Sequence, residues 1–413
     1  VIGAGGAGFS AAIEAKNAGA TVVLLEKMPQ VGGNSLISGA EMNAAKNWVQ
    51  PKLGITDDSP ELHAKDTYLG GDKKGDMKVI NVMTHNALAG AEWCRDYLGV
   101  RFEPDNLFFF GGHSRKRALI PVGHTGTEFI TKFQAKADEL GIPVITNMKA
   151  EELIKDKSGR VVGVKATMNG AEYTFNAKGG VVLATGGFGA NPAMVKKYNP
   201  KIDERFKTTD APGTTGEALY MAQRAGAELV NMQYIQTYPI CDPISGVIEL
   251  IADARFDGAI MLNQEGKRFV EELGRRDVLS EAILDQTGGY CWVLWNDKIG
   301  AVSNTVKEHP TEYDAFTKQG IMTTCPDLKC IADFTKIPYD SLKGTVDRVT
   351  SMAGKGNDKD FHHRAGLVDM SQGQYYVIKA VPSVHHTMGG VRINEKAQAL
   401  TADGKVIPGL WAA

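Results

Sequence analysis

The sequence predicts an α/β protein of two domains, and three observations support this. The chain has 413 residues, more than a typical single domain contains. Its start has the pattern of a strand, a glycine-rich turn, a helix and a second strand, as in parallel sheets. Over residues 236–379 the pattern changes to several helices and short strands between proline-containing loops. We therefore expect a discontinuous first domain, residues 1–235 and 380–413, and an inserted second domain, residues 236–379.

Composition excludes several classes of function. The formal net charge is -2, and the basic residues are spread along the chain without a block that would favour nucleic acid or a membrane surface. No apolar run reaches the roughly 18 residues that a membrane span needs. We expect no metal site, because the five cysteines lack the spacing of zinc ligands. Cys325 and Cys330 are candidates for a disulfide, but five ordinary thiols are the favoured interpretation.

Both ends of the chain look cut. Val1 stands near the end of a strand, and Ala413 follows the end of another. The first domain is therefore expected to be truncated at both ends. No secretory leader is visible, but a chain that starts within a strand cannot report on one.

A glycine-rich motif follows the first strand. Residues 3–8 read Gly-Ala-Gly-Gly-Ala-Gly, before an apolar helical pattern. Gly3 permits a tight turn, Gly5 lets the backbone approach a pyrophosphate, and Gly8 allows close packing of helix and sheet. Glu26 ends the next strand, about 20 residues on, where a carboxylate binds ribose hydroxyls. The motif favours a Rossmann-like nucleotide site over a glycine-rich turn without a ligand.

Three further glycine-rich segments lie in the first domain. Residues 27–39 follow Glu26 directly, where a nicotinamide enzyme would have its next crossover. Residues 181–189 form a buried strand that runs into a glycine turn, after a predicted hairpin around Asn169-Gly170. Residues 213–217 open a helix. The second glycine loop in particular indicates a cofactor that stays bound and lies extended along the chain.

These four elements, in this order, resemble the FAD-binding subunits of the fumarate reductase and succinate dehydrogenase superfamily. The resemblance covers essentially the whole chain. It implies a Rossmann-like FAD-binding domain with an inserted α+β capping domain over a noncovalently bound flavin. It also implies that FAD is bound by Gly3, Gly5, Gly8, Glu26, Asn34, Ser35, Gly39, Thr185, Gly186 and Glu217.

Two further segments resemble the soluble, single-chain fumarate reductases of the flavocytochrome c type. They are residues 266–277 and the Val-His-His-Thr-Met-Gly-Gly-Val stretch at 384–391. In those enzymes reduced flavin gives a hydride to one carbon of an activated C=C bond, and an arginine protonates the other carbon. The resemblance implies that Arg276 is the arginine that donates the proton. It also implies that His385 binds the substrate carboxylate and that Arg255 is the arginine of the proton relay.

Each of these assignments has a plainer alternative. Arg275, Arg276 and Asp277 together have the pattern of a solvated salt-bridge cluster at a helix start. His385 and His386 have the pattern of a packed core pair, which is the favoured interpretation for His386. The flavin-binding elements upstream favour the catalytic role for Arg276 and His385.

Three departures from fumarate reductase concern substrate binding. Tyr238 stands where the family has a histidine, and Glu41 replaces a small residue. The usual relay glutamate is Ala252, with Asp253 beside it. One end of the pocket thus loses a cation and gains anions, which disfavours a second substrate carboxylate and favours a nitrogen heterocycle. In this respect the chain resembles the urocanate reductases of the superfamily, which reduce urocanate to imidazole propionate. Phe110 is a candidate aromatic wall for the imidazole, or a plug under a loop.

Other functions remain open from the sequence. One is another enoate reductase of the same superfamily, acting on fumarate, methacrylate or a cinnamate-like acid. Another is a relative of the ketosteroid dehydrogenases. Their substrate lacks a carboxylate, so Arg276 and His385 would have no substrate group to bind. From a different class, a noncatalytic flavin electron carrier would share every FAD residue.

The resemblance also carries expectations about partners and place. Relatives often have a haem or covalent FMN domain that feeds electrons to FAD; this chain has neither, so we expect a separate donor domain or redox protein. A second carboxylate-binding arginine is expected beyond Ala413. Many relatives are periplasmic or attached to the surface of anaerobically respiring bacteria, so an extracytosolic location is expected.

Overall fold

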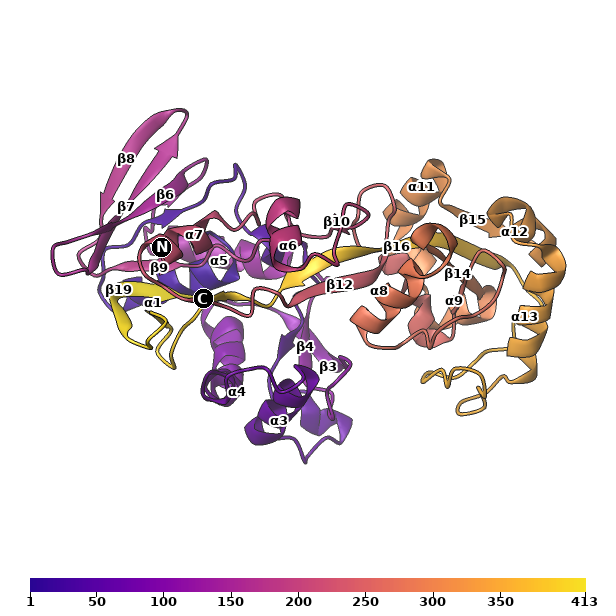
Figure 1. The fold of residues 1–413 in the computed structure, drawn as a ribbon. Helices are drawn as coiled ribbons and strands as arrows, with labels where there is room; N and C mark the ends of the chain where they lie inside the picture. Colours follow the sequence, from indigo (N-terminus) through magenta and orange to yellow (C-terminus); the bar gives the residue numbers. More distant parts are fainter. The chain divides into compact units, whose positions relative to one another are not determined.

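The computed structural model describes residues 1–413, apart from the side chain of Ser303. The chain forms two compact units (Figure 1). The nucleotide unit contains Val1–Met194, Asp210–Tyr234 and Thr387–Ala413. The insert unit contains Val195–Thr209 and Ile235–His386.

The insert unit includes two segments that the sequence had placed in the first domain, residues 195–209 and 380–386. The reason is strand pairing. β10 (Lys207–Thr208) lies parallel to β16 (Tyr375–Thr387), with Lys207 opposite Ser383 and Thr208 opposite Val384. A two-residue strand and a long buried strand that extends past residue 380 give no local signal for this boundary.

The nucleotide unit has a parallel sheet around the start of the chain, as the α/β prediction requires. Ile2 forms parallel bridges to Leu25 and Leu183, which belong to β1 (Leu24–Leu25) and β9 (Val181–Leu183). β5 (Val144–Ile145) pairs with β1, and β19 (Val406–Ala412) pairs in parallel with β9. Buried Phe9 and Ile13 of α1 (Gly6–Asn17) pack with Leu24 in the core. This packing places the glycine motif at the end of the first strand.

A three-stranded antiparallel meander completes this core. β6 (Lys149–Lys155) pairs with β7 (Val161–Met168), which pairs with β8 (Ala171–Asn176). The predicted Asn169-Gly170 hairpin is confirmed, with φ of 53° and 79° at the two residues. Both values lie in the left-handed region that a two-residue hairpin turn requires.

The nucleotide unit has further helices and short strands. They are α2 (Gly33–Ile37), η1 (Gln50–Leu53), α3 (Pro60–Gly70), α4 (Met77–Glu92), η2 (Trp93–Tyr97), α5 (Thr127–Glu139), α7 (Glu217–Arg224), β2 (Met42–Asn43), β3 (Phe102–Phe108), β4 (Ala118–Pro121), β11 (Leu229–Val230), β17 (Gly390–Val391) and β18 (Gln398–Leu400), while α6 (Pro192–Tyr198) crosses from one unit to the other.

The insert unit is built on β16. β14 (Cys291–Asn296) and β15 (Met322–Cys325) pair with it antiparallel, β12 (Ile235–Cys241) also pairs with it, and β13 (Ile260–Leu262) extends the sheet from β14. β14 is buried at every position and forms the centre of the unit's hydrophobic core. The surrounding helices are η3 (Leu250–Asp257), α8 (Arg276–Leu284), η4 (Thr287–Gly289), α9 (Asp297–Ser303), α10 (Thr305–Glu308), α11 (Pro310–Gln319), α12 (Leu328–Thr335) and α13 (Tyr339–Ser351).

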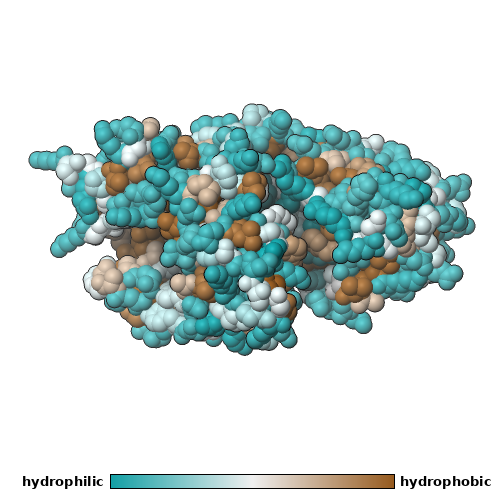
Figure 2. All heavy atoms as spheres, turned by 90° about the horizontal axis from the view of Figure 1, so that it is seen from below, coloured by the Kyte–Doolittle hydropathy of each residue, from teal (hydrophilic) through white to brown (hydrophobic). Residues whose placement is uncertain are grey.

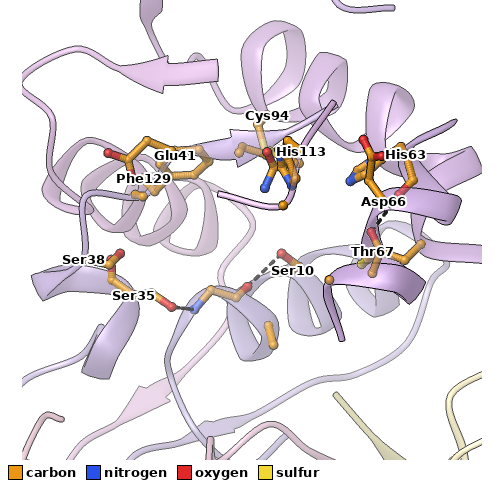
Figure 3. A pocket seen from close by; sticks show the side chains of 18 of the residues that line it. Ser10, Ser35, Ser38, Glu41, His63, Asp66, Thr67, Cys94, His113 and Phe129 are labelled. Carbon is orange, nitrogen blue, oxygen red and sulfur yellow. Dashed lines mark hydrogen bonds between the residues drawn. The ribbon is translucent and has the colours of Figure 1, made fainter. Parts of the chain in front are cut away.

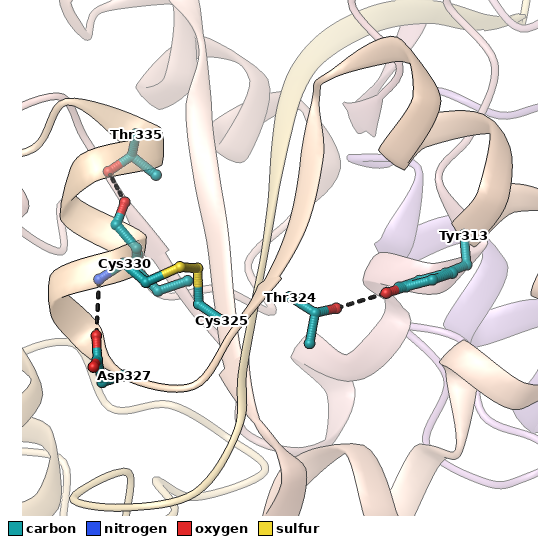
Figure 4. Close-up of a disulfide and its surroundings, with 7 residues drawn as sticks. Tyr313, Thr324, Cys325, Asp327, Cys330 and Thr335 are labelled. Carbon is teal, nitrogen blue, oxygen red and sulfur yellow. Dashed lines mark hydrogen bonds between the residues drawn. A yellow bond between two sulfur atoms is a disulfide. The ribbon is translucent and has the colours of Figure 1, made fainter.

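The favoured interpretation of five free thiols is wrong. Cys325 and Cys330 form a disulfide that joins the end of β15 to α12, with their Cα atoms 5.6 Å apart (Figure 4). Asp327 caps α12 by accepting a hydrogen bond from the Cys330 amide at 2.9 Å. The cap turns the chain back within five residues, and this brings the two thiols together.

The surface is mostly polar on the face that Figure 2 shows, where hydrophobic side chains occur singly or in small groups. Among the described residues, no helix has both the length and the apolar character to cross a bilayer.

Candidate active site

The glycine motif has the geometry of a pyrophosphate turn. Gly3 has a φ of 99°, and a Cβ there would lie 2.3 Å from the Ala184 carbonyl oxygen. A Cβ at Gly8 would lie 1.7 Å from the Gly3 carbonyl oxygen. Gly5 precedes α1 and gives it no side-chain cap. A tight glycine turn that leads into a helix N-terminus is an arrangement that fits a dinucleotide phosphate.

Glu26 and Glu217 approach the same small cavity from different parts of the chain. This cavity of about 60 Å³ is lined by Gly3, Glu26, Thr185 and Glu217, all predicted FAD residues. Glu26 accepts hydrogen bonds from the amides of Ala4 and Met28, each at 2.9 Å. These two bonds fix its carboxylate at the ribose end of the predicted nucleotide site.

Glu217 is held by a neighbouring cation. Burial favours its neutral form, but hydrogen bonds from Thr215 and Lys27 prevail and lower the pKa of Glu217. The Lys27 Nζ–Glu217 Oε2 distance is 2.9 Å. Glu217 is therefore an anion, and as such an acceptor for hydroxyl groups.

A larger cavity of about 720 Å³ lies beside the N-terminal half of α1 (Figure 3). Ser10, Ser35 and Glu41 line it together with residues of α3 and α5. The Ser35 hydroxyl accepts a hydrogen bond from the Gly6 amide at 3.0 Å. This contact ties the second glycine loop to the first, so a cofactor that extends along both is accommodated.

Asn34 and Gly39 belong to the second glycine loop, and Gly186 lies next to Thr185 at the smaller cavity. The Asn34 amide donates to Asp210 at 2.8 Å and accepts from the Ala211 amide at 2.6 Å. Burial raises the pKa of Asp210 to about 6. A Cβ at Gly39 would lie 2.6 Å from a Glu41 carboxylate oxygen, so the Glu41 side chain would have to move. Gly186, with a φ of 70°, follows Thr185 at the smaller cavity.

Phe110 lies beside the larger cavity. Its ring packs on Phe108 at 4.7 Å and on His113 at 6.0 Å, while Gly111, Gly112 and His113 line the wall. Its contact with a substrate ring stays a prediction.

Sequence reasoning missed a buried charge network next to this cavity. Arg117, with 0% of its side chain exposed, donates to Asp58 and Asp66 at 2.7 Å each. Asp66 and His63 line the cavity, and burial, with Arg117 next, lowers the pKa of His63 to about 4. The one local signal was an arginine directly before an apolar strand, Ala118–Pro121.

In the insert unit, Arg276 is the first residue of α8. Its guanidinium donates to the Gln236 side-chain oxygen at 2.7 Å and lies 4.7 Å from the centre of the Tyr238 ring. Burial, with Arg255 nearby, lowers the pKa of Arg276. Arg275 and Asp277 do form an exposed ion pair at 2.7 Å. The salt-bridge interpretation thus describes the neighbours of Arg276.

Tyr238 brings the predicted catalytic residues together. The buried Tyr238 hydroxyl accepts a hydrogen bond from Arg255 at 3.2 Å, and Arg255 also donates to the Glu272 carbonyl oxygen at 3.3 Å. The His385 ring lies 5.3 Å from the Tyr238 ring. Burial, and then the Asp253 charge, raise the pKa of Tyr238, so the phenol stays neutral. Tyr238, Arg255, Arg276 and His385 are called the arginine cluster below.

His385 is a neutral histidine at physiological pH. Burial, then the charges of Arg276 and His386, lower the pKa of His385 to about 4. Its Nδ1 atom lies 2.7 Å from the Thr209 hydroxyl oxygen. When Thr209 donates this bond, Nε2 carries the proton and can donate to a substrate carboxylate. The core interpretation of His386 is wrong, because its side chain is exposed.

The described residues contain no group of three histidine, cysteine, aspartate or glutamate side chains arranged to hold a metal ion. The polar groups assembled here are instead hydrogen-bond donors, cations and phosphate-binding amides.

Comparison with known proteins agrees with this geometry. The FAD binding domain family matches residues 1–413. A urocanate reductase from Eggerthella lenta is 43% identical over 417 residues, which span 100% of this chain and 68% of that protein. A cytochrome-type fumarate reductase from Shewanella frigidimarina is 36% identical, over 100% of this chain and 70% of that protein.

A solved structure is also similar. The open conformation of a flavocytochrome c3 fumarate reductase has a TM-score of 0.85 and 32% identity, over 100% of this chain and 71% of that one. The α/β prediction is thereby confirmed.

The fold and the site define a flavin-dependent oxidoreductase of the class that acts on carbon–carbon double bonds. The chain belongs to the FAD binding domain family, within the fumarate reductase superfamily, and its cofactor is FAD.

Proposed function

We propose that this protein reduces the C=C bond of urocanate to give imidazole propionate. The observation that carries the proposal is Tyr238: a neutral phenol stands within the arginine cluster where a dicarboxylate reductase has a potential cation. The 43% identity with a urocanate reductase supports the same substrate.

The carboxylate end of the substrate is assigned to Arg276 and His385. A conjugated double bond accepts a hydride only when the charge that develops toward the carboxylate is stabilised. Arg276 offers a cation and His385 a neutral N–H donor. Bound FAD, when reduced, supplies the hydride to one carbon.

Arg276 is assigned the proton for the other carbon. A guanidinium normally holds its proton too tightly to act as an acid. Burial and the positive charge of Arg255 weaken that hold here. The bond to Gln236 fixes the guanidinium without a carboxylate partner at that nitrogen, so the geometry favours proton donation to a carbanion.

For the N–H groups of the heterocycle, the sequence offers two candidate carboxylates, Glu41 and Asp253. Carboxylates accept N–H bonds from an imidazole and repel a second carboxylate. Glu41 lines the larger cavity, and Asp253 acts electrostatically on both Tyr238 and Arg276. Phe110 is assigned a supporting place beside the ring.

The test compares the rates at which the protein reduces the candidate substrates. The FAD-loaded protein is given reduced viologen with urocanate, fumarate, methacrylate or no enoate, and viologen oxidation is followed. We expect urocanate to be reduced faster than fumarate, and Tyr238→His to shift the ratio toward fumarate. Faster fumarate turnover by the unaltered protein would refute the urocanate assignment, and no enoate-dependent oxidation would favour an electron carrier.

We also propose an extracytosolic location, with electrons supplied by a separate haem or FMN domain or redox protein. The Cys325–Cys330 disulfide supports the location, because structural disulfides are rare in the reducing cytosol. Alkylation of the protein in intact and lysed cells tests this: recovery of both thiols in reduced form would contradict it.

A further inference from the structure

One carboxylate outside the predicted site touches the helix that carries Arg255 and Asp253. Glu312, on α11, accepts a hydrogen bond from the Ile251 amide of η3 at 2.9 Å. Its neighbour Tyr313 shares a hydrogen bond with Thr324 of β15 at 2.9 Å, which fixes this part of α11 (Figure 4). Glu312 is half-buried and so retains access to water.

Glu312 and Asp253 lie at the same end of η3. Asp253 follows Ile251 by two residues, which is a rise of about 4 Å along a 3₁₀ helix. The two carboxylates are close enough that the Asp253 charge raises the pKa of Glu312. Asp253 in turn acts on Arg276 and Tyr238. Glu312, which water can reach, and Arg276 are therefore both near enough to Asp253 to feel its charge.

The proposed reaction requires a supply of protons to Arg276. Arg276 must regain a proton after each turnover, and the position where relatives have a relay glutamate is Ala252 here. We propose that Glu312 is a positioning residue that returns protons from solvent to Arg276 by way of Asp253. The proposal rests on the proposed reduction of an enoate and adds the route by which its proton is supplied.

The proton balance is as follows. An Arg276 N–H bond breaks as the substrate C–H bond forms. Glu312 passes its proton to the Asp253 carboxylate, the Asp253 O–H bond then breaks as the Arg276 N–H bond re-forms, and Glu312 takes a proton from water. One solvent proton is consumed per double bond, and these steps move no electrons.

The surroundings of Glu312 suit a proton carrier. Burial, and then Asp253, raise its pKa to about 7 despite the Ile251 amide, and a carrier works best with a pKa near the operating pH. Glu249, fully buried before η3, has its pKa raised by burial, then by Asp242 and Glu312. Glu249 is therefore neutral, and Lys307 and Glu308 of α10 are exposed.

The test is Glu312→Gln in the FAD-loaded protein. Glutamine keeps an oxygen for the Ile251 amide but cannot carry a proton. We expect steady-state kcat for urocanate to fall on the order of tenfold with KM unchanged. A single turnover of prereduced protein should keep its rate, because Arg276 starts with its proton. The matched control is Glu308→Gln, an exposed glutamate of α10, which should leave both rates unchanged.

The pH profile separates this role from a structural one. Unaltered protein should lose kcat as pH rises through about 7, where Glu312 loses its proton. Glu312→Gln should be slow and flat over that range, and Glu312→Asp should restore part of the rate and the slope. Unaltered kcat in Glu312→Gln, or a raised KM with unchanged kcat, would overturn the proposal. Absence of enoate turnover in the unaltered protein would instead defeat the proposed function.

Discussion

Two arginines, the buried Arg117 of one unit and the half-buried Arg276 of the other, are held in opposite ways. Arg117 of the nucleotide unit is bonded to Asp58 and Asp66, and despite its burial their hydrogen bonds raise the pKa of Arg117. Arg276 of the insert unit donates to the neutral side chain of Gln236, and burial lowers its pKa. Arg117 therefore holds its proton tightly. Arg276 can offer both its charge and its proton to a substrate.

The contrast separates two tasks within one chain. The nucleotide unit holds its predicted ligand largely with backbone geometry, at Gly3 and Gly8 among others, and its buried charges neutralise each other. The insert unit gathers cations and neutral donors around Tyr238. Substitutions at matched positions in the two units should therefore fail in different ways.

The largest expected effect is on the rate. Arg276→Ala should lower kcat for enoate reduction by 10³-fold or more, since general acids contribute about 10²–10⁴-fold and a carboxylate contact is lost as well. The bound FAD absorption spectrum should remain. Arg275→Ala, which removes the exposed pair with Asp277, is the control. Loss of FAD from Arg276→Ala would place this arginine in the wrong role.

The next effect is on stability. Arg117→Met should lower the free energy of unfolding by about 3–5 kcal/mol, because it leaves two buried carboxylates without their cation. Denaturant unfolding measures this change. Arg348→Met, at the exposed pair with Asp360, should cost no more than about 1 kcal/mol. Equal losses in the two variants would remove the distinction between the two arginines.

A smaller effect is expected at the phenol. Tyr238→Phe keeps the ring beneath Arg276 but removes the hydroxyl that accepts the Arg255 hydrogen bond. A hydrogen bond to a charged group contributes about 1.5–3 kcal/mol, so kcat should fall roughly 10-fold or more. Steady-state kinetics with each enoate measures it. An unchanged kcat would show that Arg255 does not depend on this contact.

The last effect is a change in the slope of stability against pH and not a fixed loss. Burial raises the pKa of Glu249, so the unfolded chain releases this proton at a lower pH than the folded protein does. Its contribution to stability is therefore present below the usual glutamate pKa and is lost as pH rises above it, by up to about 1.4 kcal/mol per pH unit. Glu249→Gln should remove this part of the slope in thermal unfolding between pH 5 and pH 8. A slope identical to that of the unaltered protein would mean that Glu249 is ionised in both states.

Local sequence determined the nucleotide side of this protein. Gly3, Gly5, Gly8 and Glu26 lie within one βαβ unit, and their spacing alone fixes a turn, a helix N-terminus and a carboxylate. The Asn169-Gly170 hairpin was readable for the same reason: a two-residue turn is decided by its own residues. Resemblance to a family added Arg276 and His385, whose roles remain predictions.

Only the tertiary structure decided which distant groups share an environment. Arg117 with Asp58 and Asp66, Tyr238 with Arg255 and Arg276, and Glu312 with η3 are pairings between separate elements. The Cys325–Cys330 bond and the β10–β16 pairing are likewise set by how the chain turns back on itself. Protonation follows from burial and neighbouring charge, which have no local sequence pattern, and so the neutral His385 and the weakened hold of Arg276 on its proton emerge only once the chain is folded.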